Sequence, residues 1–95
     1  MDYKVQFTKF TEKQLTKIPV YVKEKLFAWM ASVEGYGLPE TQRISGYHDE
    51  PLKGRLKGKR SVRLTLQWRL IYVLTPTNEI TFIMVERITP HEYRH

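Results

Sequence analysis

The stretch SVRLTLQWRLIYVL, residues 61–74, decides the fold class. Its first half alternates between polar and apolar residues, the apolar ones being Val62, Leu64, Leu66 and Trp68. An apolar residue at every second position is typical of a β-strand with one buried face. Because the stretch is longer than most strands, we predict a break near Leu66–Gln67 and therefore two strands.

Two more strands are predicted on either side of this stretch. ITFIMVERI, residues 80–88, is strongly apolar and follows the turn TPTNE, residues 75–79. At the other end of the chain, YKVQFTKF, residues 3–10, alternates between apolar and polar side chains. This period of two predicts a half-buried strand at the N-terminus.

Two helices are predicted between the first strand and the others. Thr11 is the expected N-cap of a short helix that runs to about Lys17, and Pro19 separates it from a second helix. In this second helix the apolar residues recur with helical spacing at Val22, Leu26, Trp29, Met30 and Val33. EGYGLPE, residues 34–40, should end it, because it contains two glycines and a proline.

These elements predict an α+β fold in one domain, residues 1–95. It consists of an N-terminal strand, a two-helix hairpin and an antiparallel β-meander, with the hairpin packed on one face of the sheet. Residues 43–58 are expected to form a loop, with a possible short strand at 43–45. The chain has no cysteine and no apolar stretch of the ~20 residues that span a membrane, so we expect a soluble, cytoplasmic protein without a membrane partner.

Positive charge is concentrated in EPLKGRLKGKRSVRL, residues 50–64. The net charge is +6, and no Asp or Glu occurs between residues 51 and 78. One acid, Glu50, precedes six basic residues: Lys53, Arg55, Lys57, Lys59, Arg60 and Arg63. Such density indicates a polyphosphate ligand such as nucleic acid, and the alternative is a solvated strand face that keeps the protein soluble.

Two arginines lie within the predicted strands. Arg63 alternates with Val62 and Leu64, so its side chain should point away from the helices. Arg69 follows Trp68 in an otherwise apolar segment, where an unpaired charge is costly. Its side chain is predicted either to form an ion pair with Glu86 or to clamp a phosphate, for which the guanidinium has a fitting geometry.

The C-terminal sequence ITPHEYRH, residues 88–95, combines basic and aromatic side chains after the last strand. This combination suits RNA, whose bases stack on aromatic rings while cations hold the backbone. His91 is a plausible general acid or base, although a lone histidine is most often simply exposed. Its partner in proton transfer would be Glu50 or His48, and the ligand set around HDE, residues 48–50, is a poor one for zinc, so no metal or cofactor is expected.

Together these residues resemble the RelE-type toxins of the RelE/ParE superfamily. The resemblance covers nearly the whole chain and rests on EPLKG at 50–54, RSVRL at 60–64, QWRLIYVL at 67–74 and the terminal HEY at 91–93. The HigB-like and YoeB-like branches are the most similar. The former shares the Gln-Trp-Arg run, and the latter shares the acid before Pro-Leu-Lys.

The resemblance implies a toxin of a type II toxin–antitoxin system. Such a toxin cleaves messenger RNA in the A site of the 70S ribosome without a metal, and a cognate antitoxin protein silences it. Catalysis would fall to Glu50 as general base, His91 as general acid, Arg63 and Arg69 at the phosphate, and Tyr93 beside the substrate. RNA and ribosome binding would involve Lys53, Arg55, Lys57, Lys59, Arg60 and Arg94.

Other readings stay open from the sequence. In other branches of the superfamily lysines or arginines take over proton transfer and electrostatic duties. On that reading a lysine or arginine replaces His91 as the general acid, and Glu50 is only a loop acid paired with Lys53. A ParE-like protein would share the fold but inhibit DNA gyrase by binding, without nuclease activity. A basic RNA-binding module or a decayed toxin is the third possibility.

Overall fold

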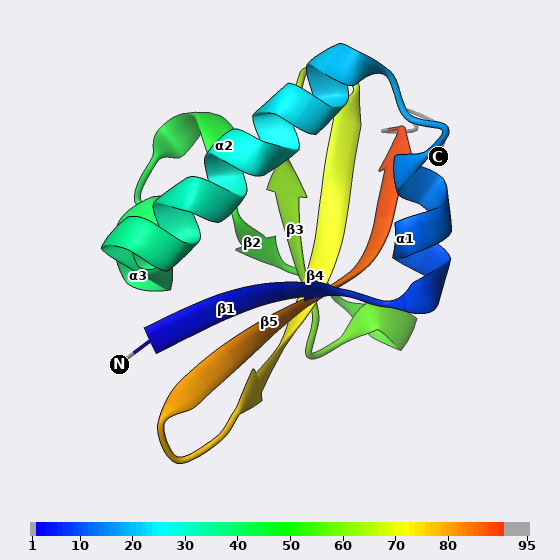
Figure 1. The fold of residues 1–95 in the computed structure, drawn as a ribbon. Coiled ribbons are helices and arrows are strands. Elements are labelled where there is room, and N and C mark those ends of the chain that lie inside the picture. Colours follow the sequence, from blue (N-terminus) through cyan, green and yellow to red (C-terminus); the bar gives the residue numbers. More distant parts are fainter. Residues whose placement is uncertain (1, 91–95) are drawn as a thin grey trace.

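The computed structural model describes residues 2–90, which form a five-stranded sheet with helices on one face (Figure 1). The strands are β1 (Asp2–Phe7), β2 (Glu50–Pro51), β3 (Arg60–Arg63), β4 (Trp68–Pro76) and β5 (Ile80–Pro90). Their order in the sheet is β1-β5-β4-β3-β2; β1 is parallel to β5 and the other pairs are antiparallel. The α+β prediction and the C-terminal meander are confirmed.

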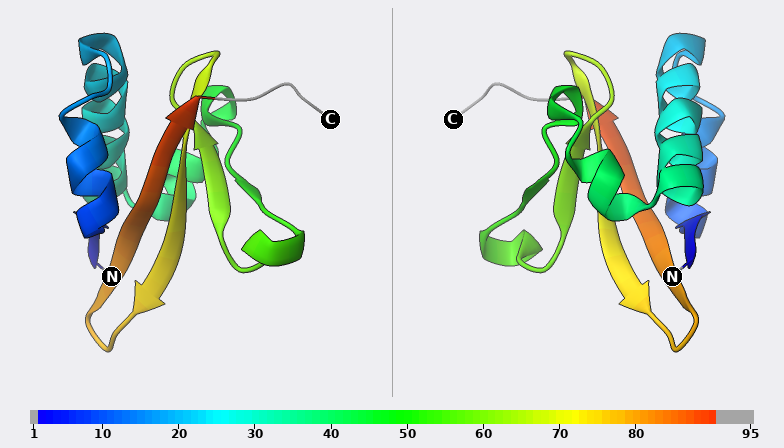
Figure 2. Two further views of the ribbon diagram at one scale, coloured as in Figure 1. Left: turned by 90° about the vertical axis from the view of Figure 1, so that its right-hand side faces the viewer. Right: turned by 90° about the vertical axis from the view of Figure 1, so that its left-hand side faces the viewer.

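The helices are α1 (Lys9–Leu15), α2 (Val20–Tyr36) and α3 (Leu38–Gln42). Both views in Figure 2 place α1 and α2 on the same side of the sheet. The core lies between these helices and the sheet. α2 contributes four fully buried residues to it: Val22, Leu26, Trp29 and Val33. The helical spacing of these residues predicted this face correctly, and the sheet covers it with Val62, Leu70, Tyr72, Ile83, Val85 and Ile88.

The start of α1 differs from the prediction. The N-cap is Thr8, whose hydroxyl accepts a hydrogen bond from the Thr11 N–H at 3.1 Å. Thr11 lies inside the helix, fully buried, and its hydroxyl donates to the carbonyl of Val85 at 3.0 Å. The Thr8 N–H is also bonded to that carbonyl, so the chain leaves the sheet at Thr8 and the helix begins there.

The end of α2 was predicted correctly, but the helix that follows was not. Gly37 has φ +97° and ends α2 in a conformation that favours glycine. α3 begins at the next residue and buries Leu38 and Thr41. The Thr41 hydroxyl lies 2.6 Å from that of Ser32, which fastens α3 to α2.

The connections between strands also differ in part. The short strand predicted at 43–45 is wrong: Arg43 caps α3, and Ser45–Tyr47 forms a 3-10 turn. The edge strand is instead β2, the two residues Glu50 and Pro51. The predicted break is confirmed between β3 and β4, where the N–H groups of Leu64 and Thr65 both bond the carbonyl of Trp68.

Gln14 replaces a missing strand at the edge of β5. β1 pairs with β5 only as far as Phe7 and Val85, so the rest of β5 has no strand on that side. The Gln14 amide donates to the Ile88 carbonyl at 2.7 Å and accepts from the Ile88 N–H at 2.9 Å. One side chain thus satisfies both backbone groups of a buried strand residue.

Replacing Gln14 with glutamate should lower the free energy of unfolding by about 1–3 kcal/mol, the cost of an unpaired buried polar group. A carboxylate keeps the shape but cannot donate to the Ile88 carbonyl. Urea unfolding measures the change, and Gln67→Glu in an exposed loop is the matched control. A Gln14→Glu variant as stable as the control would contradict this role.

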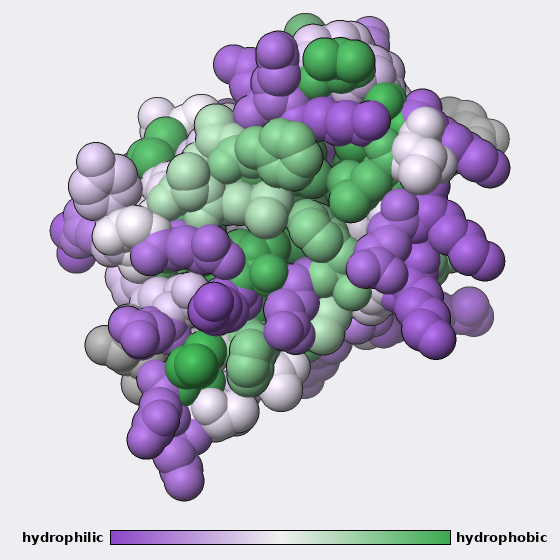
Figure 3. Space-filling view, in the orientation of Figure 1, coloured by the Kyte–Doolittle hydropathy of each residue, from purple (hydrophilic) through white to green (hydrophobic). Residues whose placement is uncertain are grey.

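The outer surface of the helix layer carries exposed apolar side chains. Figure 3, which looks onto the helices, shows green and pale green surface between purple charged groups. On α2, Val20, Tyr21 and Phe27 are all more than half exposed. This surface lies on the opposite side of the sheet from the strongly basic loop described below.

Candidate active site

The face of the sheet opposite α1 and α2, here called the open face, carries most of the charged residues of β3, β4 and β5. Val62, Leu70 and Val85 are buried beneath the helices, so the residues that alternate with them point the other way. The open face therefore bears Glu50, Ser61, Arg63, Arg69, Ile71, Glu86, Arg87 and Thr89. Strand register arranges most of these side chains in two neighbouring rows.

The first row consists of Arg63, Arg69 and Thr89, one residue from each of three adjacent strands. Side chains that lie directly opposite on neighbouring strands start only about 4.5–5.5 Å apart at Cβ, and like charges in such a pair repel each other. Arg63 and Arg69 form such a pair. Guanidinium groups are fork-shaped donors that bind phosphate oxygens in pairs, so these two arginines are candidates for contacts with a phosphate.

The second row contains Glu50, Ser61, Ile71 and Arg87. Glu50 of β2 pairs with Ser61 of β3, and Ser61 is two residues before Arg63. The row of Glu50 is therefore the one next to the arginine row. Glu50 is exposed, and between residues 2 and 90 its carboxylate has no ion-pair partner. The structure thus brings Glu50, Arg63 and Arg69 to one face of the sheet, in neighbouring rows.

A buried network behind the sheet fixes the position of Glu50. The preceding residue, Asp49, has a side chain only 1% exposed, and its carboxylate accepts from Arg60 Nε at 2.6 Å and from the Tyr72 hydroxyl at 2.6 Å. Gln42 of α3 donates to the same Tyr72 oxygen at 3.1 Å. The two-residue strand β2 is therefore held by side chains as well as by its short ladder.

The network keeps the Tyr72 hydroxyl protonated. Burial, followed by the hydrogen bond and the charge of Asp49, raises the pKa of Tyr72 well above its ordinary value of 10.0. Above pH 10 the unfolded chain loses this proton and the folded chain retains it. The contribution of Tyr72 to the free energy of unfolding should therefore be fully present below about pH 10 and should fall as the pH rises further. Burial also raises the pKa of Tyr47, which acts in the same direction.

We expect Tyr72→Phe to weaken this loss of stability at high pH. The variant should be less stable than the parent at pH 7, because Asp49 loses one donor, but its unfolding free energy should fall less between pH 10 and pH 11. Urea unfolding across this range is the measurement. Tyr36→Phe, at a position 79% exposed, is the control, and equal slopes for Tyr72→Phe and the parent would refute the account.

Most of the predicted RNA-binding residues lie in the loop between β2 and β3. Lys53, Arg55 and Lys57 are exposed, and within residues 2–90 none forms an ion pair. A 2.9 Å bond from the Leu52 N–H to the Lys59 carbonyl closes the loop, and Gly54 and Gly58 have positive φ values. Figure 2 places this loop, with its 3-10 turn Gly54–Leu56, on the side of the sheet away from the helices.

Two predicted contacts of charged residues are arranged differently. Arg60 does not join the open face, because its guanidinium binds Asp49 on the helix side. Glu86, one proposed partner of Arg69, is instead ion-paired with Lys59 at 2.5 Å. Opposite Arg69 on β5 lies Thr89. His91, Tyr93 and Arg94 lie outside the described residues, so their assignments stay predictions.

Asp49 and Arg87 contribute to this region of the structure, although no pattern in the sequence predicted it. Asp49 acts through partners 11 and 23 positions away, which no local pattern reveals. Arg87 reaches the open face through a β-bulge: Ile71 pairs with Arg87 but Tyr72 pairs with Val85, so Glu86 is an extra residue. A bulge places two consecutive side chains on the same face.

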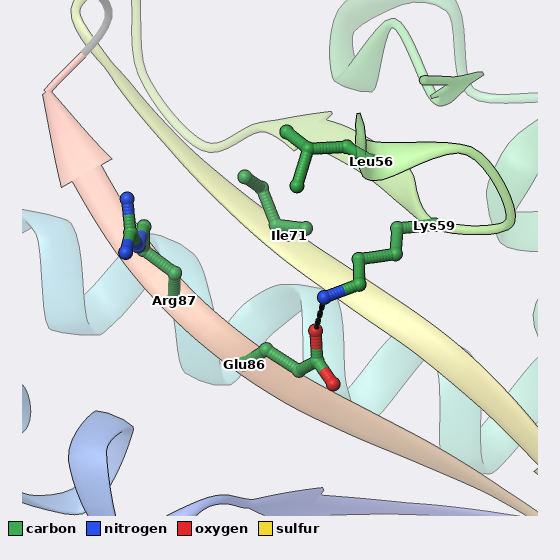
Figure 4. A pocket seen from close by; sticks show the side chains of 5 residues that line it. All are labelled: Leu56, Lys59, Ile71, Glu86 and Arg87. Carbon is green, nitrogen blue, oxygen red and sulfur yellow. Dashed lines mark ion pairs between the residues drawn. The ribbon is translucent and has the colours of Figure 1, made fainter. Parts of the chain in front are cut away.

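A cavity of about 230 Å³ opens on this face beside the second row. It is lined by Leu56, Lys59, Ile71, Glu86 and Arg87. Figure 4 shows Leu56 beside Ile71 and the Lys59 ammonium pointing at the Glu86 carboxylate. The Arg87 guanidinium lies 5.7 Å from the centre of the Phe10 ring of α1.

No three His, Asp or Glu side chains within residues 2–90 gather closely enough to hold one metal ion. None of the helices in that range combines the length and the apolar character needed to cross a bilayer.

Comparison with solved structures identifies the fold. A YoeB/ParE toxin from Agrobacterium tumefaciens superposes with a TM-score of 0.68 at 20% identity, covering 94% of this chain and 99% of the other. YafQ in the E. coli DinJ–YafQ complex gives 0.63 at 26% identity, covering 95% and 92%. The toxin–antitoxin complex RelBE2 from Mycobacterium tuberculosis gives 0.58 at 24%, covering 97% and 100%.

The chain therefore has the RelE/ParE-type toxin fold over nearly its whole length. At the level of sequence, no family model matches it, and neither does any curated protein.

Proposed function

We propose that this protein is the toxin of a type II toxin–antitoxin system and cleaves messenger RNA in the ribosomal A site as an endoribonuclease. The observation that carries the proposal is the pair Arg63 and Arg69, opposite each other on the open face with the carboxylate of Glu50 in the next row. A phosphodiester with a neighbouring 2′-hydroxyl matches this set of one base and two phosphate ligands.

In the proposed reaction Glu50 removes the proton from the ribose 2′-hydroxyl. The resulting oxygen attacks the adjacent phosphorus, and the bond from phosphorus to the 5′-oxygen breaks. Arg63 and Arg69 stabilise the extra negative charge that develops on the phosphorane. His91, or a lysine or arginine in its place, gives a proton to the departing 5′-oxygen, and Tyr93 stacks on or orients the substrate. The products are a 2′,3′-cyclic phosphate and a 5′-hydroxyl.

The basic loop supports the ribosomal part of the proposal. Lys53, Arg55, Lys57 and Lys59 lie between β2 and β3, next to the site in the chain, and a ribosome presents RNA phosphates on all sides of a bound messenger. Arg60 and Arg94 belong to the same proposed set, although the Asp49 contact leaves Arg60 less available. A cognate antitoxin is proposed because the neighbours DinJ–YafQ and RelBE2 are toxin–antitoxin complexes.

Expression in bacteria with mapping of messenger RNA ends tests the proposal. Induction of the parent chain should arrest growth and produce cuts within codons, whereas Glu50→Gln should arrest growth weakly or not at all. Glu79→Gln, an exposed carboxylate on the β4–β5 turn, is the control and should behave as the parent. Arrest with intact messenger RNA and trapped gyrase–DNA complexes would favour a gyrase inhibitor instead. Normal growth with salt-dependent RNA binding would favour a binding module.

A further inference from the structure

The cavity on the open face has the composition of a nucleobase pocket. Its walls include two aliphatic side chains, Leu56 from the loop and Ile71 from β4, and Figure 4 shows them side by side. Its volume of about 230 Å³ is below the ~300–1,000 Å³ of pockets for drug-sized molecules, so it suits one flat ring system. Aliphatic walls offer such a ring dispersion contacts on its faces.

The polar groups of the cavity come from an irregularity in β5. The bulge at Glu86 and Arg87 turns both side chains to the open face, where a regular strand would present only one of them. Lys59 holds the Glu86 carboxylate through one oxygen, Oε1. Arg87 is supported from the other side by the Phe10 ring. The cavity is thus lined by a carboxylate that one cation, Lys59, holds in place, and by a second cation, Arg87.

The position of the cavity connects it to the proposed reaction. Ile71 and Arg87 belong to the row that begins with Glu50. Ile71 lies two strands away from Glu50, a distance on the order of 10 Å. The row of Arg63 and Arg69 lies two residues farther along the strands, about 7 Å from the row of Glu50 and Ile71. A base in the cavity could therefore belong to a nucleotide adjoining the phosphate held by these arginines.

We propose that this cavity binds a base of the substrate RNA and that Glu86 selects guanine. The inference rests on the proposed function and adds to it a specificity-determining residue. An ionised carboxylate only accepts hydrogen bonds, so it favours a base edge that offers adjacent N–H donors. Guanine presents two, N1–H and the 2-amino group, whereas uracil places carbonyl oxygens on both sides of its single N–H. Lys59 and Arg87 balance the charge of Glu86 and attract the phosphate of the same nucleotide.

Binding of mononucleotides tests this without any cleavage. Guanosine, inosine and uridine 5′-monophosphates are titrated into the protein at fixed salt, with backbone amide shifts recorded by NMR. Inosine lacks only the 2-amino group of guanosine. The proposal predicts shifts at Leu56, Lys59, Ile71 and Arg87, and a dissociation constant about tenfold lower for the guanosine nucleotide than for the inosine one, the discrimination of one good bidentate contact.

Glu86→Gln should reduce this tenfold ratio to nearly one, while Glu79→Gln should keep it. Equal affinities for the three nucleotides in the parent, or an unchanged ratio in Glu86→Gln, would overturn the proposal, as would shifts confined to other parts of the molecule. Thermal unfolding verifies that both variants are folded. Lys59→Met provides a second test, because loss of the Lys59 cation should weaken the binding of all three nucleotides without changing the order of their affinities. A failure of messenger RNA cleavage would remove the proposed function but leave this binding result intact, so the two failures are distinguishable.

Discussion

Replacing Arg69 with alanine is expected to reduce the rate of RNA cleavage by about 10²–10³-fold, the usual effect of removing one group that stabilises developing charge. Arg69 lies opposite Arg63 in the middle of the sheet, where the backbone is held by strands on both sides. In the proposed reaction this guanidinium acts on the phosphate, whereas the loop cations act at the periphery. The single-turnover rate on programmed ribosomes reports this step directly.

Two further variants separate catalysis from attraction. Arg69→Lys retains the charge but loses the planar fork, and should recover only part of the rate. Lys53→Ala removes an exposed loop cation, and should weaken binding and reduce its salt dependence with little change in the rate of the bound complex. If Arg69→Ala and Lys53→Ala, both folded, had the same effects, the assignment of Arg69 to the reaction would be wrong.

The largest expected effect on stability is that of Trp29→Ala, a loss of about 3–5 kcal/mol in the free energy of unfolding. Trp29 is fully buried between α2 and the sheet, and its ring centre lies 5.7 Å from that of Tyr72. Small domains have only about 5–15 kcal/mol of stability in total. The variant should therefore lie close to the unfolding transition, as circular dichroism during urea titration will show.

Trp29→Phe is the informative comparison. Within residues 2–90 the indole Nε1 of Trp29 has no hydrogen-bond partner, so phenylalanine removes an unsatisfied donor as well as volume. Its cost should be well below that of alanine. Similar costs for the two variants would indicate that the stability of the core does not depend on filling this space.

Periodicity predicted the parts of the fold that depend on burial. Val22, Leu26 and Val33 recur with helical spacing because α2 has one buried face, and Val62 and Leu64 alternate with polar residues because one side of the sheet is covered. Leu66 continues the alternation, but it lies between β3 and β4 and is 70% exposed. The start of α1 was placed too late because Thr8 and Thr11 are both acceptable caps. The hydrogen bonds of each to Val85, more than seventy positions away, determine which one acts.

The candidate site was predictable only in outline. The alternation of apolar and polar residues correctly predicted that the Arg63 side chain points away from the helices. The charge pattern drew attention to Glu50 and to the basic loop. That Arg63 faces Arg69 depends on the cross-strand register, and that Glu86 meets Lys59 depends on the bulge in β5. Asp49 was overlooked because its partners come together only when α3, β3 and β4 have packed.

The most direct test of the central claim is cleavage of one messenger RNA by the purified protein, free in solution and bound to programmed ribosomes. We predict cuts only on the ribosome, within the A-site codon, with a 5′-hydroxyl on the downstream fragment. A 2′-O-methyl group at the cut nucleotide should abolish cleavage, because that oxygen is the nucleophile. Undiminished cleavage of the methylated RNA, or no cleavage of any RNA on ribosomes, would contradict the account.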